Sequence, residues 1–223
     1  MTARLTENKL ALFDCDGTLI DGQASICEAM EHAFAAQRLT APPRGAVRRA
    51  VGLSLPVAMR SLLPEADDAT RSRVVDSYKQ AFRTARLEGR VAQPLVPGIR
   101  DVLDALRQAG WVLGVATGMS DRGLTHCLAE NGLTNRFATL QTADGNPSKP
   151  HPAMAEAALF EVACDPRQSV MIGDTVFDIE MAVNAGMRGI GVDWGYHASK
   201  DLLAAGAELV ARQPADITEY LLS

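Results

Sequence analysis

The sequence predicts an α/β fold with a doubly wound parallel sheet and an all-helical segment inserted after the first strand. Short apolar runs bounded by turn residues recur along the chain, as expected for strands buried on both faces of a parallel sheet. Amphipathic stretches with helical spacing lie between most of these runs. Strands that alternate with helices indicate parallel pairing through crossover connections.

The predicted strands are Leu10–Phe13, Val112–Ala116, the short run Phe137–Leu140, Val170–Ile172, Gly189–Val192 and Glu208–Ala211. The predicted helices between them are Gly98–Gln108, Asp121–Glu130, Ala153–Ala163 and Asp178–Ala185. Each helix is long enough to cross from one parallel strand to the next.

One interval breaks the alternation. From Gln23 to about Arg90 the chain has helical stretches but no strand-like run, and the last and longest stretch is Asp67–Leu87. The proline-flanked segment Pro94–Gly98 then predicts a stiff linker back to the sheet. We therefore expect a helical insert of about 70 residues. The predicted domains are a catalytic core of residues 1–21 and 93–223 and a helical cap of residues 22–92.

Composition and charge narrow the classes of function. The chain has 223 residues, is 47% hydrophobic and carries a net charge of −5, which gives no reason to expect nucleic acid or an anionic membrane as partner. No apolar run approaches the roughly 18 residues of a membrane span, and Met1–Lys9 is too polar for a signal peptide. Four scattered cysteines without C-x-x-C spacing favour reduced thiols and a cytoplasmic protein. Monomer and homodimer both remain open.

Polar segments follow four of the predicted strands. They are residues 14–18 (DCDGT), 117–120 (TGMS), 148–152 (SKPHP) and 173–178 (GDTVFD). Because the carboxyl ends of parallel strands form the crevice where ligands bind, we expect these segments to converge on one edge of the sheet. Cys15 lies between two aspartates that disfavour its thiolate, so we interpret it as a packing residue.

The residue types in these segments suit phosphoryl transfer. The carboxylates of Asp14, Asp16, Asp174 and Asp178 cannot share a dry pocket without a cation, and hard oxygen ligands of this kind favour Mg²⁺. Lys149 adds an ammonium group that can meet phosphate charge. A carboxylate can serve as nucleophile through an acyl phosphate, and a second carboxylic acid can protonate the leaving alcohol.

Thr117 and Gly118 complete a phosphate cradle. Thr117 offers a hydroxyl group, and the amides from Gly118 to Ser120 precede a predicted helix, whose amino terminus attracts anions. Each feature alone has an ordinary explanation, because D-x-D-G occurs in turns and calcium loops and an aspartate at a helix start is commonly a cap. Their common position beyond the strands favours a shared site.

With these motifs the chain resembles the haloacid dehalogenase-like hydrolase superfamily, in particular its phosphoglycolate phosphatase-like branch with a helical cap. The matching motifs are F-D-C-D-G-T-L-I-D (13–21), A-T-G-M-S (116–120), S-K-P-H-P (148–152) and G-D-T-V-F-D (173–178). The resemblance covers nearly the whole chain and implies a Rossmann-like core, with the cap inserted just after the first motif.

The resemblance also implies a role for each residue. Asp14 would be the nucleophile and a metal ligand, and Asp16 the general acid/base that binds Mg²⁺ through its backbone carbonyl. Dehalogenase relatives lack an aspartate at position 16, so Asp16 favours cleavage of phosphate from oxygen. The remaining roles are phosphate binding by Thr117, Gly118 and Lys149, metal binding by Asp174 and completion of the acidic cluster by Asp178.

The expected function is therefore Mg²⁺-dependent hydrolysis of a small phosphorylated metabolite, either phosphoglycolate-like or a sugar phosphate. A phosphomutase of the β-phosphoglucomutase type and a catalytically silent binding protein are the alternatives. Specificity is expected in the cap, where Arg49 and Ser54 lie near a predicted interhelical turn and Tyr78, Lys79 and Arg83 share one helix face. Solvated arginines and a packed tyrosine are the alternative for these residues. His126 and His197 are interpreted as structural.

Overall fold

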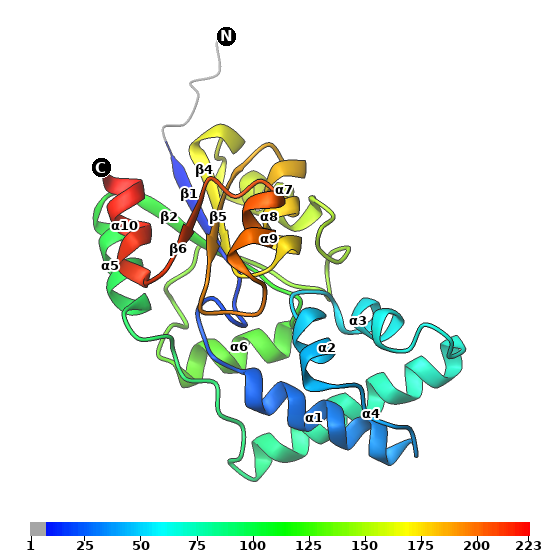
Figure 1. Ribbon diagram of the computed structural model, residues 1–223. Helices are drawn as coiled ribbons and strands as arrows, with labels where there is room; N and C mark the ends of the chain where they lie inside the picture. The colour runs from blue at the N-terminus through cyan, green and yellow to red at the C-terminus, as the bar shows by residue number, and fades with distance from the viewer. Residues whose placement is uncertain (1–7) are drawn as a thin grey trace.

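The structure is a computed structural model that describes residues 8–223. Within these residues, parallel strands form one sheet in the order β3-β2-β1-β4-β5-β6, and the chain winds outward from β1 in both directions (Figure 1). The strands are β1 (Lys9–Phe13), β2 (Trp111–Ala116), β3 (Thr139–Gln141), β4 (Ser169–Gly173), β5 (Arg188–Val192) and β6 (Leu209–Ala211). The predicted doubly wound α/β fold with a Rossmann-like core is confirmed.

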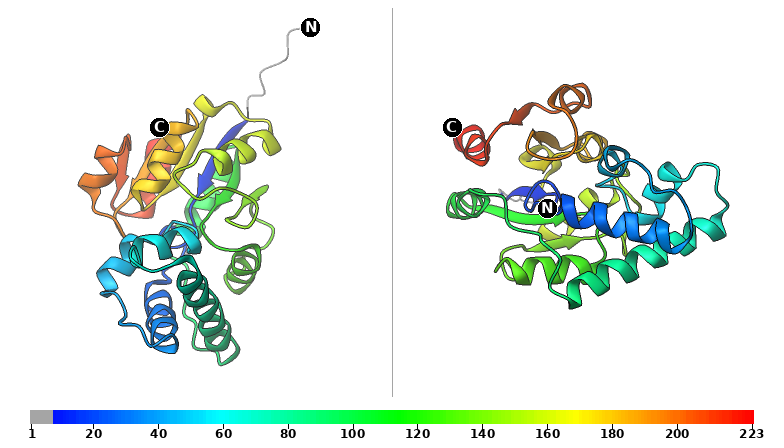
Figure 2. Two further views of the ribbon diagram at one scale, coloured as in Figure 1. Left: turned by 90° about the vertical axis from the view of Figure 1, so that its right-hand side faces the viewer. Right: turned by 60° about the horizontal axis from the view of Figure 1, so that its bottom comes forward.

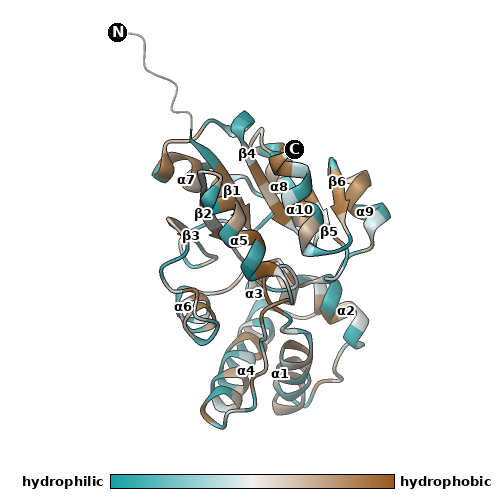
Figure 3. Ribbon diagram, turned by 90° about the vertical axis from the view of Figure 1, so that its left-hand side faces the viewer, coloured by the Kyte–Doolittle hydropathy of each residue, from teal (hydrophilic) through white to brown (hydrophobic). Residues whose placement is uncertain are grey.

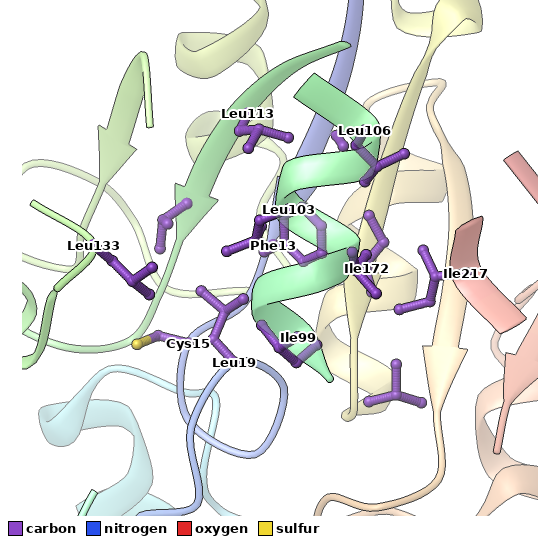
Figure 4. Close-up of a cluster of buried hydrophobic side chains, with 14 of the residues drawn as sticks. Phe13, Cys15, Leu19, Ile99, Leu103, Leu106, Leu113, Leu133, Ile172 and Ile217 are labelled. Atoms are coloured by element: carbon purple, nitrogen blue, oxygen red, sulfur yellow. The ribbon is translucent and has the colours of Figure 1, made fainter. Parts of the chain in front are cut away.

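Helices cover both faces of the sheet because the central strands present apolar side chains to each face. Ala11 and Phe13 of β1 belong to one apolar cluster, whereas Leu10 and Leu12 belong to another. The helices that pack on the first face are α5 (Ile99–Gln108), α6 (Asp121–Glu130) and α10 (Pro214–Leu222) (Figures 3 and 4). Those on the second face are α7 (Ala153–Val162), α8 (Val176–Asn184) and α9 (Ser199–Ala204). A short 3₁₀ helix, η1 (Pro166–Gln168), precedes β4.

The interval between β1 and β2 is helical up to the linker that leads into α5. Its helices are α1 (Gln23–Ala36), α2 (Arg44–Arg49), α3 (Leu55–Leu62) and α4 (Asp68–Leu87). They share a separate apolar cluster that includes Met30, Phe34 and Met59 and lie beyond the carboxyl ends of the strands (Figures 1 and 2). Tyr196, from the loop after β5, also packs into this cluster. The division into a core and a cap at residues 22 and 92 stays a prediction.

The described residues contain no helix that is both long and apolar enough to cross a membrane. Most of the polar segment Met1–Lys9 lies outside the described residues, and with it the part of the sequence on which the signal-peptide prediction rested. Cys15 is fully buried, with its Sγ 3.8 Å from the Sγ of Cys127 in α6. Its place in the apolar cluster of Figure 4 agrees with a packing role.

Candidate active site

The site is centred on Asp14, the residue directly after β1. The parallel register pairs Phe13 with Val115 of β2 and Ile172 of β4, so all three strands end at one level. The amide of Asp14 donates a hydrogen bond of 2.9 Å to the carbonyl oxygen of Ile172. This bond fixes the backbone of Asp14 at the crevice where ligands bind in open α/β sheets.

Lys149 lies between two buried carboxylates. Its Nζ is 2.9 Å from Asp14 Oδ1 and 2.6 Å from Asp178 Oδ1. All three side chains are excluded from solvent. Burial alone would disfavour each charge, but opposite charges at hydrogen-bond distance offset that cost.

Neighbouring donors fix the other two aspartates of the cluster. Asp174 accepts hydrogen bonds from Thr18 Oγ1 at 2.8 Å and from the amide of Tyr196 at 2.9 Å. Asp178 Oδ2 accepts bonds from the amide and the hydroxyl of Thr175, at 3.0 and 2.7 Å. Both oxygens of Asp178 are therefore used, one by Thr175 and one by Lys149.

The donor set fits a divalent cation. Carboxylate oxygens of Asp14, Asp174 and Asp178 all lie within 4.8 Å of one another, and Asp14 Oδ2 is buried without a hydrogen-bond partner among the described residues. Burial raises the pKa of Asp14 to about 7 despite the opposing effect of Lys149. Burial and the charge of Asp14 likewise raise the pKa of Asp174. The single positive charge of Lys149 does not neutralise three carboxylates. Asp14 and Asp174 are therefore suited to serve as oxygen ligands of Mg²⁺.

Asp16 faces the same cavity as Asp14. Burial raises its pKa to about 6, although the amide side chain of Gln93 and the charge of Lys149 lower it. Gly17 makes the tight turn directly after Asp16, with a φ of 87°. A Cβ atom at Gly17 would lie 2.4 Å from Asp174 Oδ2, so a larger residue would displace the carboxylate that we expect to bind the metal.

Thr117 and Gly118 follow β2 and precede α6. The amide of Thr117 donates to the carbonyl of Gln141 at 2.9 Å, and the hydroxyl of Thr117 accepts from the amide of Met119 at 3.2 Å. Gly118 touches the turn between α2 and α3, because a Cβ atom there would lie 2.5 Å from the carbonyl oxygen of Leu53. The phosphate-binding segment predicted from the sequence therefore lies directly beneath this turn.

A cavity of about 560 Å³ lies between this turn, α4 and the strand ends. Ser54 lines it, and the amide of Ser54 donates a 2.8 Å hydrogen bond to Ser148 Oγ, next to Lys149. Arg49 does not line the cavity; it is exposed at the end of α2, where its carbonyl oxygen lies 3.2 Å from His197 Nε2. The structure thus brings Ser54 to the site and leaves Arg49 outside it.

The cavity is also lined by Tyr78, Lys79 and Arg83 of α4, the three residues that the sequence predicted to share one helix face. Sequence reasoning missed Thr18, Gln93 and Tyr196. Thr18 lies inside the first motif, and Tyr196 follows the end of β5, so the strand-end argument could have found both. Gln93 lies neither in a motif nor after a strand, so nothing in the sequence marks it as a site residue.

Comparisons with known proteins agree with this geometry. A profile of the family described as haloacid dehalogenase-like hydrolase matches residues 11–192. A protein of Dickeya dadantii named as a probable phosphatase, IndB, is 34% identical over 205 residues, which cover 90% of this chain and 88% of that protein. A phosphoglycolate phosphatase of Agrobacterium fabrum is 33% identical over 196 residues, 84% of this chain and 81% of its own length.

Among solved structures, a hydrolase from Pseudomonas syringae superposes with a TM-score of 0.85 at 24% identity. The superposition covers 96% of this chain and 98% of that one. At this level of identity, the likeness concerns the fold alone.

Proposed function

The chain belongs to the haloacid dehalogenase-like hydrolase family and is a phosphoric monoester hydrolase, and from this premise we propose that it hydrolyses a small phosphorylated metabolite with Mg²⁺ through an acyl phosphate on Asp14. The observation that carries the proposal is the environment of the Asp14 carboxylate. Its carboxylate lines the cavity, is paired with Lys149 through one oxygen, and has a second oxygen without a partner among the described residues.

In the first step, a carboxylate oxygen of Asp14 attacks phosphorus and the bond between phosphorus and the alcohol oxygen breaks. Asp16, in its protonated form, gives its proton to that leaving oxygen. Thr117 and the amides of the following residues hold the phosphoryl oxygens, and the Lys149 ammonium opposes their charge. The alcohol leaves, and the phosphoryl group remains on Asp14.

In the second step, the Asp16 carboxylate takes a proton from water while the water oxygen attacks phosphorus. The bond between phosphorus and Asp14 breaks, which restores the free carboxylate and the protonated Asp16 and releases inorganic phosphate. Mg²⁺, held by Asp14, Asp174 and the backbone carbonyl of Asp16, would neutralise charge on the phosphoryl group. Asp178 would keep Lys149 in place through the 2.6 Å ion pair.

The names of the relatives make phosphoglycolate the first substrate to test and sugar phosphates the second. A Mg²⁺-dependent screen of phosphorylated metabolites, ranked by kcat/KM, would identify the preferred compound. Release of inorganic phosphate from a hexose 1-phosphate supports a phosphatase, whereas its conversion to the 6-phosphate would support a phosphomutase.

The nucleophile is tested with Asp14→Asn. We expect this variant to lose nearly all Mg²⁺-dependent hydrolysis of p-nitrophenyl phosphate and to form no covalent phosphoenzyme in acid-quenched samples. Asp101→Asn, the same change at an exposed position of α5, serves as the control and should keep wild-type activity. Full hydrolysis by Asp14→Asn would make the assignment of the nucleophile wrong.

A further inference from the structure

Part of the cavity wall carries cations that form no salt bridge with any described residue. Three of them come from α4 and one from the first turn of α6: Lys79, Arg83, Arg86 and Arg122. The salt bridges among the described residues involve none of the four. Because the three residues of α4 are spaced by four and three positions, they share one face of that helix.

Arg86 is the most enclosed of these cations. It is half-buried, whereas the other three are exposed, and its Nε is buried without a hydrogen-bond partner among residues 8–223. Its guanidinium carbon lies 5.4 Å from the centre of the Phe82 ring. The aromatic face, rather than an acid, therefore holds the guanidinium group in place.

Arg86, near the end of α4, and Arg122, in the first turn of α6, line the same cavity and are near enough for their charges to interact. Burial lowers the pKa of Arg86, and the like charge of Arg122 lowers it further. A solvated surface arginine keeps its donors in water, but the buried Nε of Arg86 does not. Two guanidinium groups that repel each other, one of them with an unused donor, are suited to an anion between them.

The same cavity holds Asp14 and Asp16, where the phosphoryl group would react. Its volume of about 560 Å³ falls within the range of about 300–1,000 Å³ that small-molecule sites occupy. Building on the proposed function, we propose that Arg86 and Arg122 bind a second anionic group of the substrate. The substrate is then a phosphomonoester that also carries a carboxylate or a second phosphate.

A matched set of substrates tests this proposal. 4-Carboxyphenyl phosphate and 4-carbamoylphenyl phosphate have nearly the same shape and differ in charge, and 1,4-phenylene bisphosphate tests a second phosphate. For the wild type, kcat/KM should be higher for one of the anionic compounds than for the carbamoyl compound. The ratio of kcat/KM for that anionic compound to kcat/KM for the carbamoyl compound measures the preference. Arg86→Gln should reduce this ratio about tenfold, as expected for loss of one charge-assisted hydrogen bond. Arg86→Lys should keep part of it.

Arg73→Gln is the control, because Arg73 is an exposed residue of α4 that does not line the cavity. It should leave the ratio unchanged. A wild-type enzyme that hydrolyses all three compounds without preference for either anion, or an Arg86→Gln variant with an unchanged ratio, would overturn the proposal.

Calorimetric binding in an Asp14→Asn background separates this inference from the proposed function. Tighter binding of an anionic compound than of the carbamoyl compound, lost on Arg86→Gln, supports the anion site even if no compound is hydrolysed. Equal dissociation constants for all three compounds would reject the site even if the protein proves to be an active phosphatase.

Discussion

Lys149 Nζ lies 2.9 Å from Asp14 Oδ1, and both side chains are almost completely excluded from solvent. Burial on its own lowers the pKa of Lys149, but the charges of Asp14 and Asp178 outweigh it and hold that pKa above its ordinary value. Lys149 is therefore a cation at neutral pH. Its charge offsets part of the cost of burying the carboxylates of Asp14 and Asp178.

Replacing Lys149 with methionine should destabilise the protein most at alkaline pH. The change leaves Asp14 and Asp178 without their cation, and breaking a buried ion pair costs about 3–5 kcal/mol. At pH 5.5 the carboxylates can bind protons instead, so the loss of unfolding free energy should be smaller. Urea unfolding of Lys149→Met at pH 5.5 and pH 8 measures both values. The control is Lys200→Met, an exposed position; equal losses at the two pH values would contradict the prediction.

Mg²⁺ should stabilise the protein more at pH 8 than at pH 5.5. The folded pKa of Asp14, about 7, lies above the value of 3.8 expected for an unfolded chain, so the folded state binds more protons between these values. The contribution of Asp14 to the unfolding free energy of the metal-free protein then falls as pH rises from about 4 to about 7. A bound cation removes that penalty, and free Mg²⁺ at 100 times its Kd adds about 2.7 kcal/mol.

Thermal unfolding in EDTA and in Mg²⁺ at the two pH values checks this prediction. Asp14→Asn should show a weaker pH dependence in EDTA, because it removes the carboxylate with the raised pKa. An increase in Tm on adding Mg²⁺ that is as large at pH 5.5 as at pH 8 would argue against a metal bound by this carboxylate cluster.

Asp16→Asn should affect substrates according to their leaving groups. An alkoxide needs a proton to leave, whereas p-nitrophenolate needs little help, and general acid catalysis contributes about 10²–10⁴-fold. We therefore expect kcat/KM to fall by about that factor for ethyl phosphate and by much less for p-nitrophenyl phosphate. Equal losses on the two substrates would indicate that Asp16 does not act as the acid.

The sequence predicts the fold well where burial leaves a periodic pattern. The strands at Leu10–Phe13 and Val170–Ile172 are buried on both faces, and β1 and β4 extend each of them by at most one residue at either end. The predicted elements did not include α9 and α10. Each of these helices buries a single side chain fully, Leu202 in α9 and Ile217 in α10, and they are only six and nine residues long, so the apolar spacing that identifies a helix has little length over which to repeat.

The residues of the candidate site also fall into two groups, those that the sequence predicts and those that it does not. Residues of the four motifs meet because the strands that precede them run parallel and end at one edge of the sheet, and the strands and their parallel pairing were predicted from local patterns. Arg86 and Gln93 reach the cavity through the packing of α4 and of the linker after it, and no local spacing encodes that placement. For the same reason, the sequence did not reveal that Ser54 lines the cavity while Arg49, five residues earlier, does not.

Gly118→Ala should impair catalysis through contact with the turn between α2 and α3. A Cβ atom at position 118 would lie 2.5 Å from the carbonyl oxygen of Leu53 and 2.9 Å from that of Gly52. These are backbone atoms, so the turn or the phosphate-binding segment must shift, and a displacement of about 1 Å can lower the rate about 10²-fold. We expect kcat/KM to fall by about this factor. Gly145→Ala is the matched control, because no atom of the described residues, apart from Gly145 and its chain neighbours, lies within 4 Å of its Cβ position. If Gly118→Ala and Gly145→Ala both kept wild-type kcat/KM, the close approach of the turn would have no catalytic consequence.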